Sequence, residues 1–135
     1  MRSQEHGFVA IEWVAAVTFL LLPAAVLAGS LPTWAERKHA ATVAAREAAR
    51  QLQRDWPDVD LGRAELVATY VAADHGVDAT DVTVRIDSTG AGPGDQIRVE
   101  VRVRMPAVAV PGLARAGSWS YTARASLRVD DYRSR

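Results

Sequence analysis

The first strong pattern along the chain is a long apolar run near the N-terminus. It begins at Phe8 and ends at Leu31, and Glu12 is the only charged residue among these 24 positions. As an α-helix the run is roughly 36 Å long, which exceeds the roughly 30 Å of a bilayer's hydrocarbon core. It is also too long for an ordinary core helix of a soluble protein. The sequence therefore predicts a single membrane-spanning or signal helix over residues 8–31.

Small apolar residues dominate the next predicted helix, over residues 32–56. Arginines form a polar stripe at Arg46, Arg50 and Arg54, and alanines recur every four positions on another face. This alanine face either packs on the chain's own globular part or contacts another subunit, since small residues let helix backbones approach closely. The helix should end before Pro57. The alanines are Ala40, Ala44, Ala48, Ala41, Ala45 and Ala49.

The C-terminal half combines one helical pattern with alternating strand patterns. Apolar spacing predicts a helix over residues 61–75, with Asp60 as its N-cap and Gly76 as its stop. Alternation of apolar and polar residues predicts strands over residues 81–87, 96–105 and 118–132, the last with an apolar face from Trp119 to Val129. We expect an α+β fold: a long N-terminal transmembrane and stalk helix, then a small head with one helix and a three-stranded antiparallel sheet. In outline this arrangement resembles that of pilins.

Composition and charge exclude several classes of protein. The chain of 135 residues has 16 basic and 16 acidic side chains, so its formal net charge is zero and nucleic-acid binding is not expected. It has no cysteine, which excludes disulfides and zinc–thiolate sites. The length favours one folded domain with appendages.

Recognisable catalytic or cofactor motifs are missing from the sequence. His6, His39 and His75 lack the spacing of metal ligands. The glycine-rich stretch 90–94 lacks the lysine of a phosphate loop, and the acids in 58–60 lack the further oxygen ligands of a calcium loop. We therefore expect no enzyme, no catalytic residue, no metal or cofactor, and no small-molecule substrate.

Arginines line the polar face of the second predicted strand, at Arg98, Arg102 and Arg104. They could contact phosphate. Glu100 lies among them, and the strict alternation favours a solvated sheet face over a phosphate site.

The acid within the apolar run allows three readings. Glu12 lies near one end of the run, so it could reach the interface of a plain membrane anchor, where a charge costs less than the about 2.5–3.5 kcal/mol of the membrane centre. The small residues 26–28 before Gly29 resemble a signal-peptidase site, although the leader is not clearly positive and Glu12 interrupts the apolar core.

The third reading uses the spacing of Gly7, Phe8 and Glu12. This spacing resembles the processing site of type IV prepilins, which a membrane aspartic peptidase cleaves after the glycine on the cytoplasmic side. The resemblance implies a leader of residues 1–7, cleavage between Gly7 and Phe8, and Glu12 as the fifth mature residue. Its carboxylate could then pair with the new Phe8 amine of a neighbouring subunit and fix axial register, so Glu12 is expected to act in assembly.

Two further motifs narrow this resemblance. The segments LLLP at 20–23 and AAREAARQL at 44–52 resemble the TadE-like pseudopilins of tight-adherence (Flp, type IVb) pilus systems, of actinobacterial type. The likeness covers Gly7 to about Leu52, with Trp13 where phenylalanine is more usual. It implies a minor pseudopilin in pilus assembly, adhesion or secretion, with a prepilin peptidase, other pilin subunits and membrane lipid as partners. We expect a kink at Pro23, a stalk over residues 32–56 and a head over residues 57–135.

The expected location is the cell membrane, with a single span, a short cytoplasmic leader and an extracytoplasmic C-terminal domain. The positive-inside rule conflicts with this orientation, because Arg2 is outnumbered by Arg37, Lys38, Arg46 and Arg50 beyond the span. We expect the orientation with a cytoplasmic leader, because the peptidase site has to face the cytoplasm. The alternative function, a membrane-anchored or secreted small binding domain outside any pilus, stays open.

Overall fold

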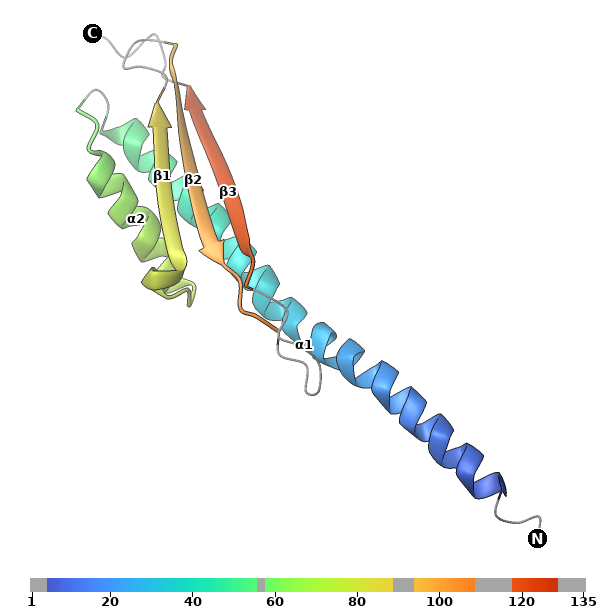
Figure 1. Ribbon diagram of the computed structural model, residues 1–135. Coiled ribbons are helices and arrows are strands. Elements are labelled where there is room, and N and C mark those ends of the chain that lie inside the picture. The colour runs from blue at the N-terminus through green and yellow to red at the C-terminus, as the bar shows by residue number, and fades with distance from the viewer. Residues whose placement is uncertain (1–4, 56–57, 89–93, 109–117, 129–135) are drawn as a thin grey trace. The chain divides into compact units, whose positions relative to one another are not determined.

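The computed structural model describes residues 5–55, 58–88, 94–108 and 118–128. Figure 1 shows the elements in chain order: helix α1 (Glu5–Arg54), helix α2 (Leu61–Asp74), the 3-10 turn η1 (Ala79–Asp81), and strands β1 (Val82–Ser88), β2 (Gln96–Arg104) and β3 (Ser120–Arg128). They belong to two compact units. The first comprises Met1–Pro32 and Ala107–Gly117, and the second comprises Thr33–Pro106 and Ser118–Arg135. From here on we call this second unit the head; it includes residues of the expected stalk as well as most of the expected head over residues 57–135. The expected α+β fold is confirmed.

Helix α1 is one continuous element of 50 residues and contains both Pro23 and Pro32. A proline removes one backbone hydrogen bond of a helix without having to end it. The helix ends at Arg54, as expected ahead of Pro57. The expected kink at Pro23 remains a prediction.

Helix α2 has the two ends that its sequence predicts. The Asp60 side chain accepts a hydrogen bond from the backbone N–H of Arg63 at 3.0 Å and so caps the first turn. At the other end Gly76 takes a φ of 77°, a left-handed conformation that glycine adopts without steric cost. This turn lets the N–H of Val77 donate to the carbonyl of Ala72 at 3.0 Å, which closes the helix end.

The sheet is an antiparallel meander in the order β1-β2-β3. In its register Val101 lies between Val84 of β1 and Ala123 of β3. Every second residue of β2 is buried and the arginines between them are exposed, as the alternation predicts. The buried residues of β2 are Ile97, Val99, Val101 and Val103.

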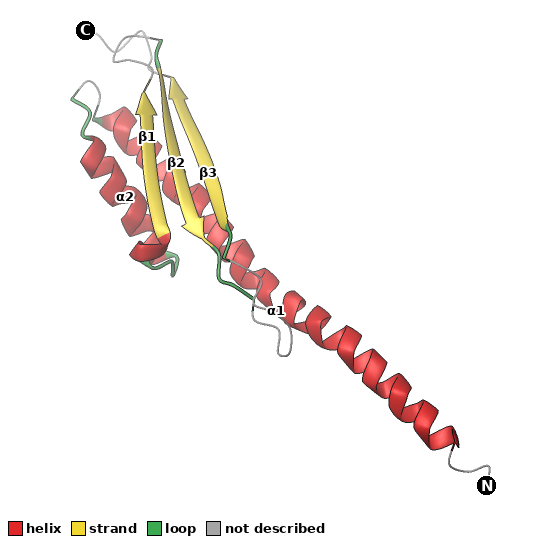
Figure 2. Ribbon diagram, in the orientation of Figure 1, coloured by secondary structure: helices red, strands yellow, loops and turns green. Residues whose placement is uncertain are grey.

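The alanine face of α1 lies in the core of the head. All six alanines are at most 4% exposed, and they share one cluster with the inward valines of β2 and with Leu52. Figure 2 shows this part of α1 behind the sheet, with α2 alongside β1. Small side chains let the helix pack closely on the strands and on α2. Of the two readings of this face, packing on the chain's own globular part is therefore the one that the structure bears out.

Helix α2 also packs through alanines. Its buried residues are Ala64, Ala68 and Ala72, whereas Leu66 and Tyr70 are 71% and 77% exposed. The helical spacing of the larger apolar residues therefore marks the helix correctly, but they do not form its buried face.

Candidate functional site

The residues of the predicted processing site lie in the first turns of α1. Gly7 and Phe8 belong to this helix, and their side chains lie outside what the structure describes. Phe8 and Glu12 are four residues apart, which is about one turn of a helix. The backbone therefore carries the predicted cleavage point and the predicted assembly residue on neighbouring turns.

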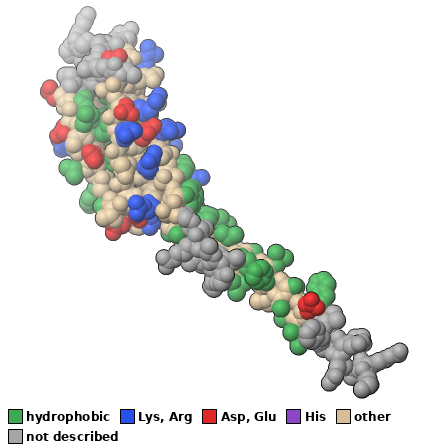
Figure 3. Space-filling model, viewed as in Figure 1, with side chains coloured by type: hydrophobic (Ala, Val, Ile, Leu, Met, Phe, Trp, Pro, Cys, Tyr) green, Lys and Arg blue, Asp and Glu red, His purple; other side chains and the backbone are tan. Residues whose placement is uncertain are grey.

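Glu12 is exposed and lies in a row of exposed apolar side chains. Its neighbours Ile11 and Trp13 are 70% and 69% exposed. None of the described residues forms an ion pair with Glu12. Figure 3 shows apolar side chains along this part of α1. In the part of the chain that is described, α1 is the one helix long and apolar enough to cross a membrane, which is compatible with a single span or a signal sequence.

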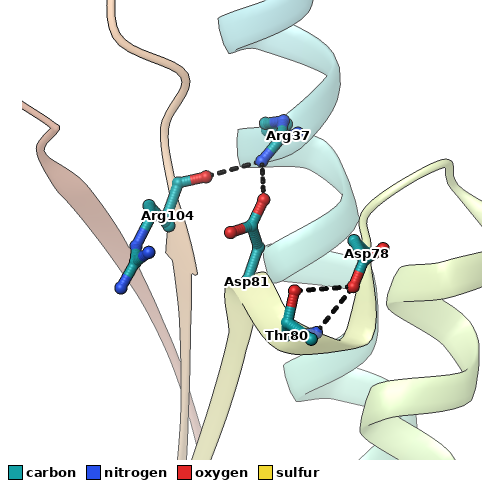
Figure 4. A network of polar contacts seen from close by, with 5 residues as sticks. All are labelled: Arg37, Asp78, Thr80, Asp81 and Arg104. Carbon is teal, nitrogen blue, oxygen red and sulfur yellow. Dashed lines mark hydrogen bonds and ion pairs between the residues drawn. The ribbon is translucent and has the colours of Figure 1, made fainter.

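A polar cluster in the head ties α1 to the sheet. The guanidinium of Arg37 on α1 donates to the carboxylate of Asp81 at 3.0 Å and to the backbone carbonyl of Arg104 at 2.7 Å (Figure 4). The partners are 44 and 67 residues further along the chain. In the sequence, Arg37 stands out only as one of the basic residues beyond the predicted span. The spacing of residues gives no indication of these contacts.

The turn η1 beside this cluster has its own cap. The Asp78 carboxylate accepts hydrogen bonds from the backbone N–H of Thr80 at 2.8 Å and from its hydroxyl at 2.7 Å. These bonds, the backbone one first, hold the pKa of Asp78 below its usual value of 3.8. The cap fixes the turn that positions Asp81 for Arg37.

A cavity of about 300 Å³ lies next to this cluster. Two arginines of β2, Arg102 and Arg104, contribute to its wall together with Trp119, which is 44% exposed. The ring of Trp119 packs edge-on against Trp34 of α1, with 5.6 Å between the centroids. Trp119 therefore lies in the cavity wall, directly before β3, where an inward core residue was expected. The lining residues are Thr80, Asp81, Thr83, Arg102, Arg104, Ser118, Trp119 and Ser120.

The exposed face of the sheet is rich in arginine. Figure 3 shows Lys and Arg side chains gathered over the head. Arg124 of β3 donates to Glu100 of β2 at 2.7 Å, and this hydrogen bond lowers the pKa of Glu100 from its usual 4.5. Arg102 and Arg104 form no ion pair with any described residue. The expected solvated face thus has more arginines than acids, and of its two acids, Asp87 and Glu100, Glu100 is paired with Arg124.

Two of the histidines meet in the head, although their spacing in the sequence gives no sign of it. The rings of His39 on α1 and His75 after α2 pack edge to face at 5.7 Å. The described residues contain no group of three side chains that could hold a metal ion, and the side chain of His6 lies outside them. The pair therefore carries a packing contact between the two helices.

No protein family, curated protein or solved structure matches this chain. The structure shows a long apolar N-terminal helix, a second helix and a three-stranded antiparallel sheet. The sheet shares one core with α1 and α2.

Proposed function

We propose that this protein is a minor pseudopilin of a tight-adherence (Flp) type IV pilus system. The observation that carries the proposal is the sequence from Gly7 to Glu12 at the start of an exposed apolar helix, which continues as the helix of a small α+β head. Both parts are what the TadE-like resemblance implies. The head's Ala-rich helix, which includes residues 44–52, supports the same reading.

In this proposal a prepilin peptidase cuts after Gly7 and creates an amine on Phe8. Residues 8–31 hold the chain in membrane lipid, and the head lies on the extracytoplasmic side. Glu12 is unpaired among the described residues and pairs with the Phe8 amine of a neighbouring pilin subunit. An acid with such a partner is tolerated in an apolar environment and sets the register of assembly. The protein then acts through assembly and not as an enzyme.

The variant Glu12→Gln tests the role of this acid in cells. We expect recovery with other pilin subunits to fall several-fold, while the amount of processed chain stays the same. Glu36→Gln is the matched control, because Glu36 is an exposed acid further along α1 without an ion pair to any described residue. Equal recovery of the Glu12 variant and the wild type would remove the assembly role. If even the wild type brings down no pilin subunit, the anchored binding domain is the better description.

A further inference from the structure

We propose that the cavity beside Arg104 binds the headgroup phosphate of an anionic phospholipid. The proposal rests on the membrane span of the proposed function, but not on cleavage or pilus assembly. It assigns the head a lipid contact of its own, in addition to the apolar helix.

The cavity offers several hydrogen-bond donors to an anion. The guanidinium of Arg104 forms no hydrogen bond or ion pair with another described residue, and Figure 4 shows it pointing away from Asp81. Arg102 uses only its Nε, in a long 3.4 Å contact with the hydroxyl of Thr122, so its two terminal nitrogens remain available among the described residues. A planar guanidinium group can donate two parallel hydrogen bonds to two oxygens of one phosphate. Thr83, Ser118 and Ser120, whose hydroxyls can also donate, line the same cavity.

The acid in the wall does not cancel this positive charge. Asp81 is held at 3.0 Å by Arg37, so its carboxylate already has a counter-charge. The hydroxyl of Thr80 donates to Asp78 and takes no part as a donor. Two arginines therefore face the cavity in excess of its compensated acid, which favours a group of net negative charge.

The position of the cavity in the chain favours a lipid as the source of this phosphate. Arg37 follows Leu31, the end of the apolar run, by six residues, which span about 9 Å as a helix and no more than about 20 Å fully extended. Through Asp81 and the carbonyl of Arg104, Arg37 touches the cavity wall. The chain between the apolar run and the cavity wall is therefore short enough to let the cavity reach lipid headgroups.

Aromatic and basic side chains gather on α1 just beyond the apolar run, and they are of the kinds found at a membrane interface. Trp34 follows the apolar run by three residues and contacts Trp119 in the cavity wall. Lys38 lies over the ring of Tyr121, 5.1 Å from its centroid. Tryptophan and tyrosine are enriched at headgroup level, and lysine and arginine near the surface attract anionic lipids.

The test is lipid retention by the full-length protein, measured by native mass spectrometry in a neutral detergent. We expect phosphatidylglycerol to stay bound, and phosphatidylcholine or inorganic phosphate to bind far less. The double variant Arg102→Gln, Arg104→Gln should retain about tenfold less phosphatidylglycerol than the wild type. Circular dichroism checks that the variant is folded, which we expect because both side chains are exposed.

Arg98→Gln, Arg128→Gln is the matched control. It removes the same charge from the same sheet face at the end remote from the cavity: Arg98 is six residues from Arg104 along β2, about 20 Å away, and Arg128 lies opposite Gln96, the first residue of β2. This control should stay within about twofold of the wild type. An equal loss in both double variants would reduce the effect to surface charge and overturn the site. Binding of inorganic phosphate without preference for phosphatidylglycerol would overturn the lipid as its source. N-terminal sequencing reads cleavage separately, so this proposal and pilus assembly can fail independently.

Discussion

The guanidinium of Arg37 lies 3.0 Å from the carboxylate of Asp81 and 2.7 Å from the carbonyl oxygen of Arg104. One side chain of α1 thereby connects the helix to the turn before β1 and to the last residue of β2. The side chains of Arg37 and Asp81 are only 20% and 25% exposed, so water screens their interaction less than it would on an open surface.

Replacing this arginine should loosen the head. We expect Arg37→Met to lower the free energy of unfolding by about 1–3 kcal/mol, because Asp81 loses a charged hydrogen-bond partner while it stays partly buried. Denaturant unfolding of the full chain in detergent, followed by tryptophan fluorescence, measures the loss. Arg46→Met is the control, since Arg46 is exposed on the same helix and has no ion pair among the described residues. Similar losses of stability in both variants would show that the contacts of Arg37 do not stabilise the head.

The alanine face of α1 should not tolerate a larger side chain. Ala44 is 0% exposed in the core of the head. We expect Ala44→Leu to lower the free energy of unfolding by about 1–3 kcal/mol, because overpacking forces strained rotamers or backbone shifts. Thermal unfolding compares it with Ala73→Leu, which adds the same side chain at an exposed position of α2. A neutral Ala44→Leu would show that this face is free to contact another subunit.

The two glycines at the ends of α2 should respond in opposite directions to alanine. Gly76 has a φ of 77° and nothing within 4 Å of an added Cβ, so Gly76→Ala meets only backbone strain, about 1–2 kcal/mol. Gly62 lies in the helix, where an added Cβ is 3.4 Å from the Asp60 carboxylate, an ordinary contact. Gly62→Ala should be neutral or stabilise by up to about 1 kcal/mol. Denaturation midpoints of the two variants, measured side by side, test this difference. Stability changes of the same sign would contradict a left-handed cap at Gly76.

Acid should weaken the head through Asp78 and Glu100. Hydrogen bonds lower the pKa of both groups in the folded protein, below their usual 3.8 and 4.5. Their contribution to stability is therefore complete above the unfolded pKa values and is lost as pH falls through the folded ones, that is, below about pH 5. Melting temperatures measured from neutral pH downward should fall in this window.

Glu100→Gln should flatten part of this acid dependence, because the neutral amide cannot titrate and gains less from Arg124. Glu65→Gln on the exposed face of α2 removes an acid that has no ion pair among the described residues, and serves as the control. The same pH profile in the Glu100 variant and the wild type would show that the Arg124 hydrogen bond does not stabilise the fold.

Local patterns were sufficient for the elements of this fold. Asp60 and Gly76 mark the ends of α2 because capping depends on a few neighbouring backbone groups. The alternation in β2 identifies its buried face, since successive side chains of a strand point to opposite sides. The apolar run of α1 is long enough to be read directly as a candidate span.

Contacts between distant segments were beyond those patterns. Whether the alanine face of α1 met its own sheet or a neighbour depended on tertiary packing, which a periodic row of alanines does not encode. The same holds for Arg37 and Asp81, and for Trp34 and Trp119, which come together only when the helix and the strand ends are packed. The cavity, with its compensated acid and two arginines that form no ion pair among the described residues, follows from those contacts.

The N-terminal residue of the mature protein tests the central claim most directly. It can be determined by sequencing or mass spectrometry of the full protein isolated from its native membranes, with cells that lack the prepilin peptidase as the control. The account predicts Phe8 as the first residue, and Met1 in the control cells. A chain that begins at Gly29 would make residues 1–28 a secretory signal, and one that begins at Met1 in peptidase-containing cells would be an uncut anchor. Either result would contradict the pseudopilin assignment.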